Sequence, residues 1–367
     1  MFKALLYSAA GCLLAIPRPA WAQTNATWTE LGTLAPAAAQ PTTWGREIHA
    51  LCPWNGKLYM GYGDYDQNTG PIVITSYDPT TRAFANAWTS RTESIEVFRP
   101  LMDRLYVPAI DPIRTRDPVF SVCDAAGQWN DGRINMPGGE TITHAYDMAT
   151  LTGTDLWLVG SSERDTRAVA LRSLDGGATW SKSLELSNQP GDSRNRFYFA
   201  QVMNNKLYLH CSYDTNCMVF DGANWTPGPS FPWYTHHIEL FLGRMLLLVE
   251  KRLFTFDGEK PKWVFSRDRL VRAFCVSGKT LYLLNETEMR IHATTDFHAW
   301  SRISPVPSNT TSLAVLNGIL YAGTADSKLY AYDQALPAEI PTDINATNAG
   351  EPSVAEPPPP EVGPPEP

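Results

Sequence analysis

Short apolar stretches alternate with turns of Gly, Asn or Asp along most of the chain, from about residue 27 to residue 334. In the first unit, the stretches 48–53, 57–62, 71–77 and 83–88 have the length and residue types of β-strands. Asn-Gly at 55–56 separates the first two, and this dipeptide between apolar runs is the strongest short signal for a hairpin. The unit therefore predicts a four-stranded antiparallel sheet.

One sequence pattern recurs along the chain: an apolar stretch, a tight turn, and then Leu-Tyr or a close variant. Its seven copies lie at residues 55–59, 103–106, 153–157, 205–208, 243–246, 278–282 and 317–321, which are spaced by roughly 35–51 residues. Self-similarity at this period is typical of propeller blades. Each copy therefore marks one blade.

An aspartate also recurs at the corner between the third and fourth strand of each unit. These corner residues are Asp78, Asp124, Asp175, Asp221, Asp257, Asp296 and Asp333. A carboxylate suits this place because it accepts hydrogen bonds from backbone N–H groups two residues further on and stabilises the turn. A tryptophan follows in six units, at Trp88, Trp129, Trp180, Trp225, Trp263 and Trp300, and we expect it to pack between neighbouring sheets.

The seventh unit lacks a fourth strand, because Pro337 follows Asp333 closely. Near the other end, residues 27–31 resemble the beginnings of fourth strands at Trp180 and Trp300. We expect this N-terminal segment to complete the last blade and so remove two open sheet edges. The predicted fold is an all-β, seven-bladed β-propeller of four-stranded antiparallel blades, spanning residues 23–336 and closed by an N-terminal strand.

The two ends differ from the repeat in composition. Residues 1–22 have a positive start at Lys3, a short apolar run and a small-residue cleavage site ending at Ala22, which predicts a secretory signal peptide. We expect a secreted or periplasmic protein without a transmembrane segment, and Cys12 offers a lipid anchor as an alternative. Residues 337–367 are rich in Pro and Glu, which predicts a disordered tail.

Composition and charge exclude several classes of function. Hydrophobic residues make up 43% and aromatic residues 11%, which is ample for a packed core. The formal net charge is −8, so the chain has no basic surplus with which to release counterions from a phosphate backbone. We expect no nucleic-acid partner, no cofactor and no metal, and a monomeric protein.

The cysteines fit an exported protein. Cys211 and Cys217 flank the predicted turn between the second and third strands of the fourth blade. Because an oxidising compartment permits disulfides, the two are predicted to pair across this hairpin.

One corner matches a known motif. Residues 173–180, Ser-Leu-Asp-Gly-Gly-Ala-Thr-Trp, resemble the Asp-box (BNR repeat, S-x-D-x-G-x-x-W) of sialidases and other secreted propellers, and residues 294–300 are a degenerate copy. The resemblance implies a sialidase-superfamily-like propeller and places the box on an outer corner, away from the functional site. The segment Phe98-Arg99-Pro100 is similar to the Phe-Arg-Ile-Pro motif of sialidases. The chain departs from sialidases in having seven units and one complete box.

Functional side chains are expected at one face of the channel, where the starts of the first strands and the loops between second and third strands converge. The candidate ligand-binding residues there are Tyr62, Asp64, Tyr65, Asp66, Asn68, Arg99, Arg114, Arg196, Tyr198 and His236. The candidate catalytic residues are His49, Asp64, Glu96, Asp111 and His144. Glu47, His237, Arg269 and Arg272 stand at other strand starts.

Each of these residues also has a structural interpretation. A histidine at a strand start can bond a backbone carbonyl, Asp64 can cap its own loop, and Arg99 can pair with Glu96.

Two functions from different classes follow. The first is a recognition propeller that binds a glycan or an exported protein through this face. The alternative is a carbohydrate-active enzyme: a sialidase-like hydrolase with two carboxyl groups, or a polysaccharide lyase with His49 or His144 as the base.

Overall fold

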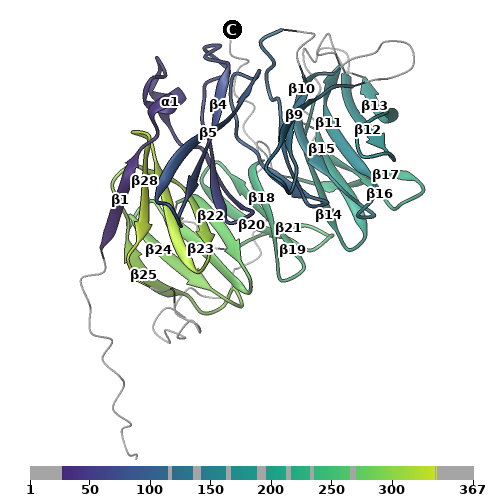
Figure 1. Ribbon diagram of the computed structural model, residues 1–367. Helices are drawn as coiled ribbons and strands as arrows, with labels where there is room; N and C mark the ends of the chain where they lie inside the picture. The colour runs from purple at the N-terminus through teal and green to yellow at the C-terminus, as the bar shows by residue number, and fades with distance from the viewer. Residues whose placement is uncertain are drawn as a thin grey trace, which may run out of the picture.

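The computed structural model describes residues 27–114, 118–134, 142–162, 167–187, 196–211, 216–231, 235–264, 270–334 and 336. Within these ranges the chain forms seven four-stranded antiparallel sheets and two helices of four residues each. Figure 1 shows the sheets following one another around the molecule in chain order. The predicted seven-bladed β-propeller is confirmed.

Each blade uses its four strands in sequence, except the last. Blade 1 contains β2 (Ala50–Trp54), β3 (Lys57–Gly61), β4 (Ile72–Asp78) and β5 (Ala83–Ser90). Blade 2 contains β6 (Arg99–Leu101), β7 (Arg104–Pro108), β8 (Phe120–Cys123) and β9 (Trp129–Gly132). Blade 3 contains β10 (Ile142–Ala149), β11 (Leu156–Ser162), β12 (Arg167–Ser173) and β13 (Ser181–Ser187). Blade 4 contains β14 (Phe197–Met203), β15 (Lys206–Cys211), β16 (Asn216–Phe220) and β17 (Trp225–Ser230).

The remaining blades complete the ring. Blade 5 contains β18 (Thr235–Phe241), β19 (Arg244–Val249), β20 (Arg252–Phe256) and β21 (Pro261–Trp263). Blade 6 contains β22 (Val271–Ser277), β23 (Thr280–Asn285), β24 (Arg290–Thr294) and β25 (Ser301–Pro305). Blade 7 contains β26 (Thr310–Leu316), β27 (Ile319–Thr324), β28 (Lys328–Tyr332) and, as its outer strand, β1 (Trp28–Thr33).

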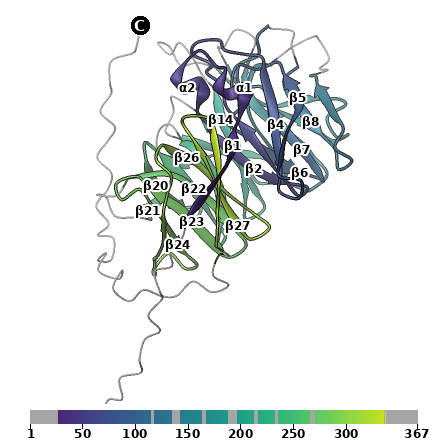
Figure 2. The same ribbon diagram turned by 60° about the vertical axis from the view of Figure 1, so that its left-hand side comes forward.

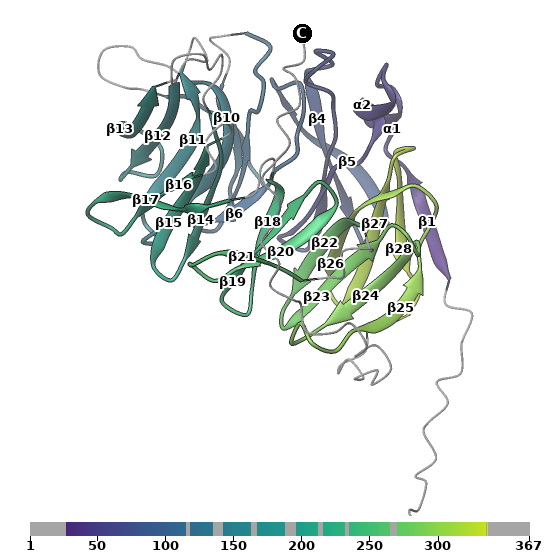
Figure 3. The same cartoon turned by 180° about the vertical axis from the view of Figure 1, so that it is seen from behind.

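The two ends of the propeller domain meet in blade 7. Strand β1 pairs antiparallel with β28, from Trp28 opposite Tyr332 to Thr33 opposite Lys328. Figures 1, 2 and 3 all show β1 beside β28, although the two lie at opposite ends of the described chain. Side chains reinforce the pairing, because Asp333 accepts hydrogen bonds from Thr27 (2.5 Å) and from Thr29 (2.6 Å). The predicted closure by an N-terminal strand is therefore confirmed.

The first strand of each blade lies innermost. The first strands of neighbouring blades contact one another, as β22 does with β26 and β10 with β14. Helices α1 (Ala35–Ala38) and α2 (Thr43–Arg46) lie between β1 and β2, and Gly63 N–H donates to the Gly45 carbonyl (3.2 Å). The helices and the loop between β3 and β4 therefore lie at the same end of the channel, which we call the mouth.

The corners opposite the mouth are held by aspartates, as predicted. Asp78, Asp124 and Asp221 each accept a hydrogen bond from the backbone N–H two residues further on. In the Asp-box corner, hydrogen bonds from Thr179 and Ser173 lower the pKa of Asp175 to about 2. These contacts explain why the motif recurs as a structural unit.

Tryptophans from these corners pack between blades. The ring centroid of Trp129 lies 6.0 Å from that of Tyr59, Trp180 lies 6.1 Å from Phe120, and Trp225 lies 5.8 Å from Trp157. Each pair joins the outer part of one blade to the sheet of the blade before it, and aromatic pairs of this kind add to the free energy gained from burial.

The predicted disulfide between Cys211 and Cys217 is wrong, because both residues are buried thiols on opposite faces of one sheet. Cys217 lies directly opposite His210, the residue before Cys211. Successive side chains of a strand point to opposite faces. The two cysteines therefore belong to different core clusters, Cys211 with blade 3 and Cys217 with blade 5.

The predicted signal peptide, with Cys12 and Ala22, and the predicted tail at 337–367 lie outside the described residues. No helix among the described residues is long and apolar enough to cross a membrane.

Candidate functional site at the channel mouth

The loop between β3 and β4 is built around Asp64, which is only 5% exposed. Its carboxylate accepts hydrogen bonds from Thr42 Oγ1 (2.7 Å) and from the backbone N–H groups of Asp66 (3.1 Å) and Gln67 (3.3 Å). With these contacts made, Asp64 caps its own loop, which is the structural alternative foreseen for it. The loop then presents its next residues, Tyr65 and Asp66, to the surface.

Residues 91–98 connect β5 to the short strand β6 and run against this loop. Ser94 forms an isolated bridge with Gly63, and Ile95 N–H donates to the Tyr62 carbonyl (2.9 Å). Gly63 has φ +120°, and a Cβ there would lie 2.5 Å from the Glu93 carbonyl oxygen. Only glycine therefore allows the loop and this segment to lie together, and the contact brings Glu93 and Glu96 to the mouth.

Glu96 has an enclosed carboxyl group without a cationic partner among the described residues. Its Oε1 has no exposed surface and no hydrogen-bond partner. Burial raises the pKa of Glu96 to about 7, the Ser94 hydroxyl opposes this, and the Asp66 carboxylate adds to it. A carboxyl group of the blade 1 loop and one of the connection to blade 2 therefore lie near enough at the mouth to influence each other.

A second pair of carboxyl groups is formed by Glu93 and Asp111. Burial and the neighbouring Asp111 carboxylate raise the pKa of Glu93 to about 7. The Asn68 amide, with its NH2 group turned toward Glu93, lies 3.2 Å from both carboxylate oxygens. On the other side, Asp111 Oδ1 lies 3.5 Å from His144 Nδ1, which also contacts the Ile110 carbonyl oxygen at 2.9 Å. The chain thus links blades 1, 2 and 3 through polar contacts.

Tyrosines from three blades also belong to this part of the mouth. The ring centroids of Tyr146 and Tyr198 are 4.7 Å apart, and the Arg196 guanidinium lies 5.6 Å from the Tyr146 ring centroid and donates to the Tyr146 hydroxyl. Tyr65 is 38% exposed, and burial, Glu96, Asp66 and Tyr198 all raise the pKa of its hydroxyl. Tyr65 comes from blade 1 and Tyr198 from blade 4, so this electrostatic influence acts between two blades that are not neighbours in the chain.

The opposite part of the mouth is charged but internally paired. Arg272 Nη2 lies 3.6 Å from Glu47 Oε1, and Arg272 Nη1 lies 3.2 Å from Glu286 Oε1. Lys251 Nζ lies 3.0 Å from Glu286 Oε2. Burial raises the pKa of Glu47, and Arg272 opposes the shift. Each acid in this group has a cation beside it.

Two predicted site residues are held in structural contacts. His49 Nε2 lies 2.9 Å from the Gly63 carbonyl oxygen, its ring packs on Trp44 with centroids 4.6 Å apart, and burial lowers its pKa to about 4. Arg99 donates to both oxygens of Asp147, at 2.6 and 2.8 Å. Arg99 therefore pairs with Asp147 of blade 3, and the predicted pairing of Arg99 with Glu96 is not formed.

The remaining predicted residues divide into three groups. Tyr62 is buried, and its hydroxyl accepts a hydrogen bond from the Val73 N–H (3.1 Å), so it supports the sheet. Arg114 is exposed. The His236 side chain and Arg269 lie outside the described residues.

Sequence reasoning missed Glu93 and Tyr146. Both lie close to predicted residues, Glu93 three positions before Glu96 and Tyr146 two positions after His144. The acidic run Thr-Glu-Ser-Ile-Glu between two strands was the available signal for Glu93. The stacking of Tyr146 had no signal, because a strand tyrosine is ordinarily part of the core.

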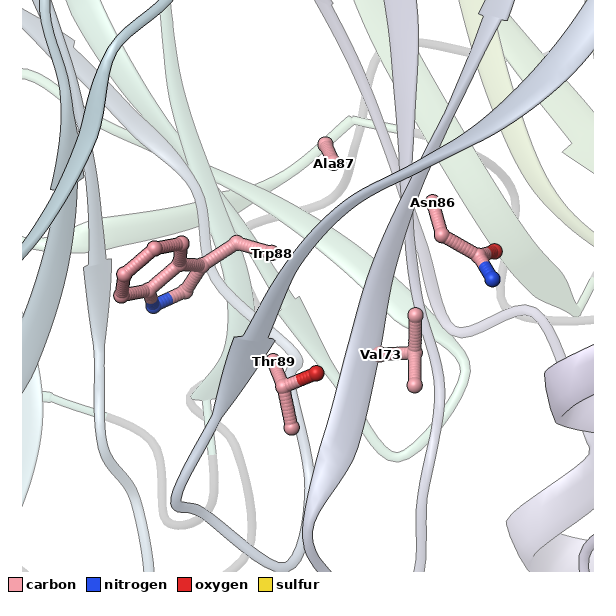
Figure 4. Close-up of a pocket in the computed structure, with 5 residues that line it drawn as sticks. All are labelled: Val73, Asn86, Ala87, Trp88 and Thr89. Atoms are coloured by element: carbon pink, nitrogen blue, oxygen red, sulfur yellow. The ribbon is translucent and has the colours of Figure 1, made fainter.

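A separate hollow of about 400 Å³ lies on the outer strands of blade 1 and is lined by Val73, Asn86, Ala87, Trp88 and Thr89 (Figure 4). The Trp88 indole donates to Asp131 Oδ1 of blade 2 at 3.2 Å, so its polar atom is occupied. The lining has no titratable side chain, which leaves the mouth as the candidate site. Among the described residues, no three His, Cys, Asp or Glu side chains are grouped to hold a metal ion.

Comparisons with known proteins identify the fold alone. No family model matches the sequence, and no curated protein matches it. Virginiamycin B lyase from Staphylococcus aureus is similar in structure, with TM-score 0.56 and 10% identity, over 85% of this chain and 99% of that one.

Two other solved structures are similar to the same extent. A GH74 xyloglucanase from Xanthomonas campestris has TM-score 0.53 and 14% identity, over 86% of this chain and 55% of that one. YCF48 bound to D1 peptide has TM-score 0.51 and 11% identity, over 85% of this chain and 97% of that one. At such low identity these likenesses support the β-propeller and leave the sialidase-like assignment without support.

Proposed function

We propose that the protein is an exported recognition propeller that binds a glycan or an extracytoplasmic polypeptide at the channel mouth. The residues proposed to contact the ligand are Tyr65, Asp66, Glu96, Arg196 and Tyr198. A secreted or periplasmic location follows from the signal peptide expected at residues 1–22, and a monomer remains our expectation.

The exposed ring of Tyr65 carries this proposal, and Tyr198 is near enough to Tyr65 to contribute to the shift of its pKa. The two residues are far apart in sequence, and Tyr65 keeps 38% of its surface exposed beside a buried carboxyl group. A buried tyrosine stabilises a core, whereas a half-exposed ring next to polar groups suits stacking on a sugar or a peptide. The similar folds of YCF48 bound to D1 peptide and of a xyloglucanase are compatible with either ligand.

The test combines a glycan array with a peptide array, both probed with the full chain after removal of its signal peptide. The proposal expects retention on one array, and at least a ten-fold loss of affinity in Tyr65→Ala for the ligand so identified. Leu174→Ala is the matched control, since Leu174 is 74% exposed and lies at the Asp-box corner opposite the mouth. Equal losses in both variants, or retention on neither array, would refute mouth recognition.

One observation favours hydrolysis as a second candidate. Glu96 has a pKa raised to about 7 and lies near Asp66, and an acid held protonated beside a second carboxyl group is the requirement for glycosidic bond cleavage. A lyase with His49 as the base is less favoured, because a pKa of about 4 makes this imidazole a weak base and its Nε2 is directed at a carbonyl oxygen. Release of reducing ends from an array glycan, abolished in Asp66→Asn while binding persists, would support hydrolysis; retention without turnover supports recognition alone.

A further inference from the structure

The acids at the mouth differ in how their charge is compensated. Asp147 has Arg99, Asp155 has Arg172, and Glu47 has Arg272 as a neighbouring cation. Among the described residues, neither Glu96 nor Asp66 has an ion pair, although their carboxyl groups influence each other. Burying a charge without a partner is costly, so the enclosed Glu96 carboxyl group, with the exposed Asp66 near it, would be stabilised by a positive group.

The same place also lacks hydrogen-bond donors. Glu96 Oε1 and Ser94 Oγ are both buried and neither makes a hydrogen bond of normal geometry, although the Ser94 hydroxyl is near enough to Glu96 to lower its pKa. Buried polar atoms of native proteins are nearly always hydrogen-bonded. A group that donates several hydrogen bonds and accepts none would satisfy both, and ammonium and guanidinium groups have this property.

The aromatic rings at the entrance favour the same ligand. Tyr65 is 38% exposed and lies close enough to Glu96 for the carboxyl group to raise the tyrosine pKa, to which Tyr198 also contributes. Faces of tyrosine rings attract cations, most often guanidinium. Arg196 does not take this role, because its guanidinium contacts Tyr146.

The depth of the carboxyl group selects the form of the cation. Because Glu96 Oε1 has no exposed surface, a group carried on a narrow stem is best suited to approach this carboxyl group. The alkyl chain of arginine or lysine is such a stem, whereas the amine of an amino sugar is attached directly to a bulky ring. We propose that the mouth binds an arginine or lysine side chain of a polypeptide partner, with its charged end at Glu96, Asp66 and Ser94. This inference rests on the proposed function and names its ligand.

The experiment compares two small probes on the full chain after removal of its signal peptide. N-acetyl-arginine amide and N-acetyl-citrulline amide have nearly the same shape and differ in charge. Calorimetry is expected to show at least ten-fold tighter binding of the arginine probe, and Glu96→Gln is expected to reduce this preference to about two-fold or less. Glu259→Gln, an exposed acid at a corner opposite the mouth, is the control and should keep the full preference.

The outcomes separate the two proposals. Equal binding of both probes, or an arginine preference unchanged in Glu96→Gln, overturns the cation subsite. If Tyr65→Ala still abolishes binding of the array ligand in that case, the recognition function stands without the subsite. Glu96-dependent binding of a glucosamine trimer without binding of the arginine probe also overturns the peptide proposal. Circular dichroism of Glu96→Gln establishes that the variant is folded, and Tyr65→Ala, which keeps the acid, should weaken the arginine probe several-fold.

Discussion

The ion pair between Arg99 and Asp147 joins the innermost strands of blades 2 and 3. Asp147 is 1% exposed and Arg99 21%, and both nitrogen–oxygen distances are below 3 Å. Asp147 also accepts the Ala200 N–H of blade 4 at 3.0 Å. Although burial opposes it, Asp147 raises the pKa of Arg99. One carboxylate therefore connects three blades.

We expect Arg99→Met to lower the free energy of unfolding by about 3–5 kcal/mol. Methionine keeps most of the volume of the arginine stem, so the loss comes mainly from leaving Asp147 charged and unpaired in the interior. The matched control is Arg167→Met. Arg167 pairs with Glu185 at 2.6 Å, but its side chain is 50% exposed, and removing such a surface pair should cost no more than about 1 kcal/mol.

Guanidinium unfolding of the wild type and of both variants measures the difference. The double variant Arg99→Met, Asp147→Asn should recover part of the loss, because it removes the unpaired charge. A cost for Arg99→Met no larger than that for Arg167→Met would refute the structural role of Arg99. The ligand-binding role expected for Arg99 would then become the better explanation of its position.

Three further predictions concern titration and thiols. Burial and Asp111 raise the pKa of Glu93 from 4.5 to about 7, so the free energy of unfolding of the wild type should fall as the pH rises through that window. Glu93→Gln should lose less stability over the same range. Urea unfolding between pH 5 and 8 measures the difference, and equal losses in the two proteins would contradict this prediction. Alkylation of the unfolded, unreduced chain should label both Cys211 and Cys217 in mass spectrometry, and protection of the pair would mean a disulfide. Burial lowers the pKa of His49 to about 4, so NMR should show a neutral ring at pH 6, and a midpoint near 6.5 would exclude the buried geometry.

The sequence was sufficient to predict the fold because the residues that recur in each unit stabilise the turns in which they lie. Asn-Gly turns set the hairpins, and corner aspartates such as Asp78 bond their own turns. Even the closing strand could be predicted from the missing fourth strand of the last unit. These signals act over a few residues, so they remain readable without the tertiary structure.

The disulfide prediction was wrong because it used proximity along the chain and ignored the alternation of side chains. The register of the two strands excludes the disulfide by one residue, since Cys217 lies opposite His210 and not opposite Cys211. A one-residue shift moves a side chain to the other face of the sheet. Register within a hairpin with a long turn cannot be derived from residue types alone.

The mouth was predictable only in part. The convergence of strand starts and loops follows from topology, but the partner of each side chain depends on packing between blades. Arg99 forms its ion pair with Asp147 of blade 3 instead of Glu96, which is near it in sequence, and the Asp64 carboxylate accepts hydrogen bonds within its own loop. Contacts between residues tens of positions apart leave no trace in the local pattern.

The distribution of charge around the mouth also divides it into two functional parts. On one side, Arg272 of blade 6 forms ion pairs with both Glu47 and Glu286, so the charges of these three groups are already compensated. Near Tyr65, the carboxyl groups of Glu96 and Asp66 have no cation among the described residues. A ligand gains little from charges that are already paired and more from those that are not.

Arg272→Met should therefore leave affinity for the array ligand within about two-fold of the wild type, while lowering the free energy of unfolding by about 1–3 kcal/mol because Glu47 loses its partner. Glu96→Gln should do the reverse, with a large loss of affinity and little loss of stability, since the neutral amide is easier to bury than a carboxylate. Titration and guanidinium unfolding of the same two preparations provide both measurements. If Arg272→Met weakens binding as much as Glu96→Gln does, the ligand spans the whole mouth, and its recognition does not depend on the uncompensated acids of blades 1 and 2.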